Sequence, residues 1–265
     1  MRTQQSKIIT SVFPLFITLV LTLPCMQSAG AQESKTFIGI KFILIESGCF
    51  QMGNDKQPTD VTVGETPSHR VCIEKPFYLG ETEVTQKQWE NIMGNNPSKT
   101  KAEDRPVDRV SWYDTQDFIQ SLNAKDGGKH FRLPTEAEWE YATRAGSDSD
   151  YSYGNDSKSL AQYAWFGNLG YKGSSHEVAQ KLPNNWGLYD VHGNVWEWVQ
   201  DWYSPTYYSN SPANNPLGPE SGKYRVYRGG SWVGKATNLR SAVRFSALPV
   251  TRTHDLGFRL VRQLD

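Results

Sequence analysis

Cysteine is scarce in this sequence, with three cysteines among 265 residues. They are Cys25, Cys49 and Cys72, and no Cys-x-x-Cys pair occurs, which argues against a dithiol redox centre. If Cys25 is removed with a leader segment, Cys49 and Cys72 remain, and two cysteines in an oxidising compartment most simply form a disulfide. That bond would stabilise the fold by about 3 kcal/mol. Two buried free thiols are the alternative.

The sequence also lacks an excess of charge of either sign. It has 28 Lys and Arg against 28 Asp and Glu. A nucleic-acid-binding protein is expected to carry a basic face, so this balance argues against nucleic acid as a partner.

Long hydrophobic runs are missing as well. The most apolar segment, residues 8–23, is about 16 residues long and contains Pro14, whereas a membrane-spanning helix needs about 20. No later segment is more apolar, so no membrane span is expected in the mature chain.

The first 31 residues have the pattern of an export signal. Arg2 and Lys7 are basic, residues 8–23 are apolar, and Ala29-Gly30-Ala31 is typical of a cleavage site. We therefore predict a signal peptide over residues 1–31 and a periplasmic or secreted mature protein. An uncleaved anchor and a lipoprotein attached at Cys25 are the alternatives, but Pro24 stands where a lipoprotein signal needs a small residue.

Several common catalytic motifs are absent. No two histidines have the four-residue spacing that places two metal ligands on one helix face. There is no Gly-x-Ser-x-Gly elbow, phosphate loop or dinucleotide-binding motif.

The chain that follows the leader predicts an α+β domain. Residues 37–53 are expected to form a hairpin, and helices are expected after Thr85, Ser111 and Thr135, each followed three residues later by Gln, Asp or Glu. Beyond Gly146 the chain should be largely irregular. Short strands are expected there at 224–228, 242–245 and 257–262. Nine Trp, 13 Tyr and 11 Phe could hold such loops by burial.

Ten short sequence blocks are specific enough to indicate a protein family. They are Gly48–Gly53, Pro67–His69, Glu83–Thr85, Pro106–Val107, Val110–Trp112, Arg132–Ala142, Asn185–Asp190, Gly193–Trp198, Arg228–Trp232 and Leu256–Arg259. In this order they resemble the sulfatase-modifying-factor, or formylglycine-generating-enzyme, family. The resemblance implies a domain over residues 37–265 with a variant C-type-lectin-like fold, in which small antiparallel sheets and helices accompany much irregular chain.

The same resemblance implies that formylglycine generation is lost. Family enzymes hold copper between two cysteine thiolates that follow the Arg-Gly-Gly-Ser block. Here Gly234 and Leu239 stand at those positions, and neither side chain can bind copper. No copper is therefore expected. A cleft could persist there, lined by Ser231, Trp232, Arg240, Arg244 and Arg259.

A calcium site is a further expectation. Asp190 and Glu197 offer carboxylates in a turn-rich segment, and Ca²⁺ prefers oxygen ligands. Spacing alone is also compatible with Asp190 capping a turn and Glu197 pairing with an arginine. The resemblance implies side-chain ligands from Asp190 and Glu197 and backbone ligands from Gly193 and Val195.

Two functions remain open. One is a calcium-stabilised binding or accessory protein whose irregular surface between Ser204 and Gly222 recognises a peptide, glycan or protein. The other is a periplasmic tailoring enzyme, an oxidase or lyase like relatives in siderophore maturation, with Glu220 or Tyr227 as acid or base. The sequence does not identify the ligand.

Overall fold

The structure is a computed structural model that describes residues 1, 32–56, 64–167 and 173–264. Residues 31–265 form one unit, distinct from residues 1–30. Apart from Met1, the predicted signal peptide lies outside the described residues. None of the helices in the described ranges is long and apolar enough to cross a membrane.

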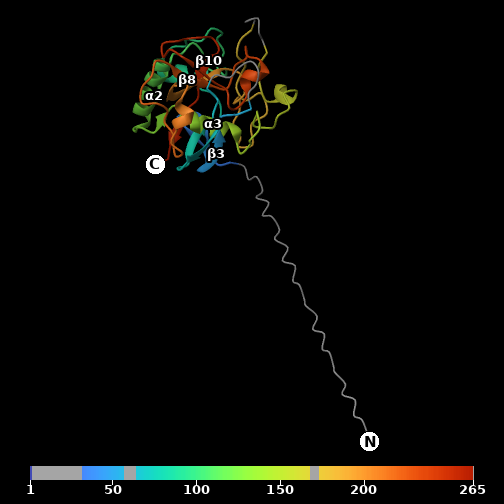
Figure 1. The fold of residues 1–265 in the computed structure, drawn as a ribbon. Coiled ribbons are helices and arrows are strands. Elements are labelled where there is room, and N and C mark those ends of the chain that lie inside the picture. The colour runs from blue at the N-terminus through green and yellow to red at the C-terminus, as the bar shows by residue number, and fades with distance from the viewer. Residues whose placement is uncertain (2–31, 57–63, 168–172, 265) are drawn as a thin grey trace. The chain divides into compact units, whose positions relative to one another are not determined.

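The first sheet joins both ends of the domain (Figure 1). Its five strands lie in the order β1 (Ser34–Phe37), β2 (Ile40–Ile45), β5 (Phe77–Gly80), β11 (Val261–Gln263) and β6 (Phe131–Arg132), all antiparallel. The Asn123 side chain donates to the Phe131 carbonyl and accepts the Phe131 N–H, at 2.9 and 2.8 Å. It thereby covers the free edge of β6, where another strand could otherwise pair.

The described residues form two further sheets. The second has the order β10 (Leu256–Phe258), β7 (Trp196–Trp202), β8 (Arg225–Arg228) and β9 (Arg244–Ala247). Only β10 and β7 are parallel within it. The third pairs β3 (Gly48–Met52) with β4 (His69–Ile73).

The strand predictions need two corrections. Residues 37–53 do not form one hairpin, because β2 turns back onto β1 through Ile38-Gly39 while β3 pairs with β4. Residues 257–262 are not one strand either. Phe258 pairs with Trp198 and Val261 with Leu79, so the chain passes from one sheet to another.

The three predicted helix starts are confirmed. Helices α1 (Gln86–Met93), α2 (Trp112–Asp126) and α3 (Glu136–Arg144) begin after Thr85, Ser111 and Thr135. Each of these residues forms a capping box with the third helical residue, which satisfies helix N–H groups that otherwise lack partners. Helix α3 ends one residue earlier than Gly146 suggests, since Ala145 already has a left-handed backbone, with φ of 47°. Short 3₁₀ helices, η1 (Ser159–Gln162), η2 (Tyr207–Asn210) and η3 (Ala236–Leu239), occur in the described part of the irregular half.

Tryptophan rings connect the helices to the second sheet. Trp89 stacks on Phe118 with ring centroids 5.2 Å apart, and Phe118 meets Phe258 edge-on. The indole N–H of Trp112 donates to the Val199 carbonyl at 2.9 Å. These contacts fix α1 and α2 against β7 and β10.

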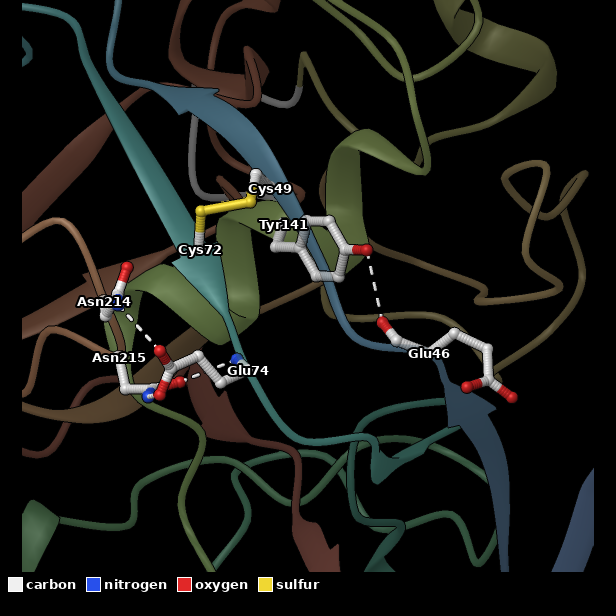
Figure 2. The surroundings of a disulfide bond; sticks show 7 residues. All are labelled: Glu46, Cys49, Cys72, Glu74, Tyr141, Asn214 and Asn215. Atoms are coloured by element: carbon white, nitrogen blue, oxygen red, sulfur yellow. Dashed lines mark hydrogen bonds between the residues drawn. A yellow bond between two sulfur atoms is a disulfide. The ribbon is translucent and has the colours of Figure 1, made fainter.

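The predicted disulfide between Cys49 and Cys72 is present, and it joins directly opposed residues of β3 and β4 (Figure 2). The backbone of Cys72 also binds the loop beside it, donating to Ala213 and accepting from Asn215. The Glu74 carboxylate accepts from the Asn214 and Asn215 side chains at 2.6 and 2.7 Å. The disulfide-linked strands β3 and β4 therefore hold residues 213–215 in place.

Candidate functional site

The Asp190–Glu197 segment has an unusual backbone. Asp190 and Asn194 have φ angles of 56° and 59°, a region that residues other than glycine seldom occupy. Gly193 has φ of 102°, and a Cβ there would lie 2.4 Å from the Trp165 carbonyl oxygen. The Asn194 N–H donates to that same carbonyl at 3.0 Å. The loop is thus held in one conformation by close contact with residue 165.

Both carboxylates of this loop already have protein partners. Arg259 donates to the two Glu197 oxygens at 2.6 Å each, and the Trp139 indole N–H donates to Glu197 Oε2 at 2.7 Å. Asp190 Oδ2 accepts the Ala179 N–H at 2.7 Å. Both alternatives that the spacing left open are therefore observed: Glu197 pairs with an arginine, and Asp190 caps a turn.

Beside this pair lie carboxylate oxygens without partners. Asp190 Oδ1 and Glu83 Oε2 are buried and accept no hydrogen bond from the described residues. Burial raises the pKa of Asp190 to about 6. Burial, together with the charges of Asp190 and Glu197, raises the pKa of Glu83 well above its usual value. When ionised, these groups lack a cation of their own.

This donor set fits a hard cation. Glu197 Oε2 accepts two hydrogen bonds and Oε1 accepts one, so Oε1 retains acceptor capacity. Asp190 Oδ1 is free, and Gly193 and Val195 lie in the same loop. In the described part of the chain no three acidic, His or Cys side chains are close enough to hold a metal. Backbone carbonyls or water would therefore complete the site, as is common for Ca²⁺.

The two positions that the resemblance assigns to the family's cysteine pair, Gly234 and Leu239, lie among apolar groups. Leu239 is fully buried and packs with Tyr151, Leu160 and Ala164. A Cβ added to Gly234 would lie 3.2 Å from Leu239 Cδ1. The Leu239 side chain thus lies against Gly234.

A buried histidine fixes the turn that carries Leu239. His192 Nε2 accepts the Ser152 N–H at 3.0 Å, so Nδ1 carries the proton and donates to the Leu239 carbonyl at 2.8 Å. Burial lowers the pKa of His192 to about 4. The ring is therefore neutral near pH 7 and serves as a structural link.

The residues expected to line a cleft are buried. Ser231, Trp232, Arg240, Arg244 and Arg259 are at most 3% exposed. Each arginine pairs with a different glutamate: Arg240 with Glu65, Arg244 with Glu136 and Arg259 with Glu197. The structure does not bring the five together on one open surface.

A chain of buried ion pairs was not anticipated from the sequence. Glu140 accepts from Arg144 and Arg228, and Glu136 lies next to Arg228 and accepts from Arg244 at 2.6 Å. The two glutamates are four residues apart on α3 and the arginines Arg228 and Arg244 face each other on β8 and β9. The four-residue spacing of the glutamates was the only local signal.

The described residues form a groove of about 1000 Å³. Its apolar lining includes Ile73, Phe77, Ile119 and Phe131, and its amide side chains are Gln116, Gln200, Asn215 and Gln263. Leu217 and Leu264 line it and are 67% and 42% exposed. Within the predicted recognition surface Ser204–Gly222, residues 215–217 reach this groove.

The two residues named as possible acid or base are not brought together by any contact in the described structure. Glu220 is exposed, whereas Tyr227 is half-buried between Trp196 and Phe245. Burial, with a smaller effect of Asp255, raises the pKa of Tyr227 to about 12. A phenol with so high a pKa is a poor base near pH 7.

Comparison with known proteins identifies the family. The family model described as sulfatase-modifying factor enzyme 1-like domain matches residues 28–264. The chain belongs to this family. A formylglycine-generating enzyme of Streptomyces coelicolor is 30% identical to it, over 84% of this chain and 89% of that protein.

Other proteins similar to this chain have other names. The chaperone protein LppX of Paenibacillus barcinonensis is also 30% identical, over 93% of this chain and 98% of that protein. The solved structure of Treponema denticola variable protein 1 superposes with a TM-score of 0.78 at 32% identity, covering 89% of this chain and all of that one. The predicted α+β, variant C-type-lectin-like fold is confirmed.

Proposed function

We propose that this protein is an exported, calcium-stabilised binding or accessory protein that has kept the family scaffold without the formylglycine-generating reaction. The observation that carries the proposal is Leu239, which fills the position of the second cysteine as a fully buried core residue. The pattern of residues 1–31 supports export.

The groove supports a polypeptide as the ligand. Its phenylalanines are only 2% exposed, so they offer no open aromatic face for stacking a sugar. Leu217 is exposed, and the amide side chains of Gln116, Gln200 and Gln263 can pair with the N–H and C=O groups of a peptide. The similarity to a protein named as a chaperone favours the same class of ligand.

Replacing Leu217 with Asp should weaken polypeptide binding at least tenfold, or about 1.4 kcal/mol, because a charge replaces an exposed apolar side chain of the groove. The probe is fluorescently labelled, reduced and carboxymethylated α-lactalbumin, a permanently unfolded polypeptide, measured by fluorescence anisotropy. Leu182→Asp is the matched control, since Leu182 is 49% exposed and does not line the groove. Absence of binding by the wild type, or equal affinities of the two variants, would contradict this assignment.

Calcium is the second element of the proposal. We expect the purified protein to retain about one Ca²⁺ per chain after desalting. A cation that binds only the folded state at 100 times its Kd stabilises that state by about 2.7 kcal/mol. Chelator should therefore lower Tm, and added Ca²⁺ should restore it. Asp190→Asn should abolish this response, whereas Asp117→Asn, at an exposed position on α2, should not. A protein that is metal-free by elemental analysis and melts identically in chelator would refute the calcium site.

A further inference from the structure

We propose that Glu83 is a positioning residue for the cation site of the Asp190–Glu197 loop. It orients the Val195 backbone without being a cation ligand itself, and it adds a third buried negative charge. This inference rests on the calcium-binding part of the proposed function. It adds a residue that precedes the loop by more than 100 positions.

Geometry places Glu83 directly against the loop. Its side chain is enclosed, with the residue 1% exposed, and Oε1 accepts the Val195 N–H at 3.4 Å. Neighbouring backbone bonds hold its segment in place, because Tyr189 donates to the Glu81 carbonyl and Val84 donates to the Phe258 carbonyl, both at 2.9 Å. Residues 81–84 therefore tie the start of the loop to β10.

The carboxylate oxygens without partners indicate that the buried carboxylates lack positive charge. Arg259 is the cation paired with Glu197, through both carboxylate oxygens. Glu83 Oε2 and Asp190 Oδ1 accept no hydrogen bond from the described residues. A buried carboxylate without a counter-charge is costly. A divalent cation in the loop would compensate the two charges that Arg259 leaves over.

Glu83 orients a cation ligand and is not itself one of the ligands. In the described residues no three acidic side chains are gathered tightly enough to chelate a metal together. Groups that orient a ligand from outside commonly change metal affinity by 10–100-fold. Glu83 contacts the N–H of the residue whose carbonyl is an expected ligand, which is the geometry of such a group.

The test compares Ca²⁺ and Tb³⁺ binding by the wild type and two single variants of the full protein, using calorimetry for Ca²⁺ and terbium luminescence for Tb³⁺. Glu83→Gln keeps the shape and removes the charge. We expect it to weaken Ca²⁺ binding about 10–100-fold and Tb³⁺ binding by a larger factor, because Coulomb energy scales with the cation's charge. Without cations its Tm should equal or exceed that of the wild type, since a neutral amide carries no cost of ionisation in this buried position. Glu81→Gln is the control, because the Glu81 carboxylate instead pairs with Lys41.

The outcomes separate the two hypotheses. If the wild type binds no Ca²⁺, the calcium part of the proposed function fails. If the wild type binds Ca²⁺ and Glu83→Gln binds both ions with unchanged affinity, the role of Glu83 is refuted and the calcium site stands. Glu83→Asp retains the charge and should retain the wild-type ratio of Tb³⁺ to Ca²⁺ affinity. Loss of that ratio in Glu83→Asp would also overturn the proposal.

Discussion

Supplied with copper, a reductant and oxygen, the purified protein is expected to leave a Cys-x-Pro-x-Arg peptide unmodified. The family reaction requires a thiolate pair that binds copper, and thiolates are the soft ligands that hold it. The resemblance places Gly234 and Leu239 at those positions, and the leucine side chain packs against the glycine. Mass spectrometry of the peptide measures the loss of mass that accompanies aldehyde formation.

The positive control is the related formylglycine-generating enzyme of Streptomyces coelicolor under identical conditions. The remaining cysteines offer no substitute, because Cys49 and Cys72 are joined to each other on β3 and β4. Aldehyde product that forms faster than in a sample without enzyme would refute the assignment. It would also require a different catalytic centre.

The largest expected loss of stability comes from Arg228→Met. The Arg228 side chain is fully buried between Glu140 and Glu136. Its removal leaves two buried carboxylates facing each other with less positive charge between them. Breaking a buried pair in this way costs about 3–5 kcal/mol. Urea unfolding followed by circular dichroism measures the change in the free energy of unfolding.

Arg252→Met is the matched control. Arg252 also makes a two-pronged ion pair, with Asp114, but its side chain is 51% exposed. Exposed pairs contribute about 0–1 kcal/mol because water screens them. A similar small loss in Arg228→Met would show that the buried chain of ion pairs does not stabilise the fold as described.

The features that the sequence predicted correctly depend on neighbouring residues or on recurring motifs. Thr85, Ser111 and Thr135 each begin a helix because a cap interacts with the residue three positions later, a range that a sequence displays directly. The disulfide followed from having two cysteines left to pair. The ordered motif blocks predicted the family, which also implied the fold.

The strand predictions were less accurate because strand pairing is decided at long range. Nothing within residues 37–53 shows that β3 pairs with residues 69–73 instead of with β2. Strand β7 was not predicted, because the glycines that precede it and its alternating tryptophans are also compatible with a loop.

Only the tertiary structure decided which side chains of the site are buried and paired. Arg240 and Glu65 are 175 residues apart in sequence and form a bidentate pair, so the arginine that could have faced a ligand is buried and neutralised. Likewise, the family resemblance implies that Leu239 stands in place of a cysteine, but only packing against Tyr151 and Leu160 shows that Leu239 is enclosed. Local sequence determines which groups are available. Their burial and pairing depend on contacts between distant segments, and these decide which groups can still bind a ligand.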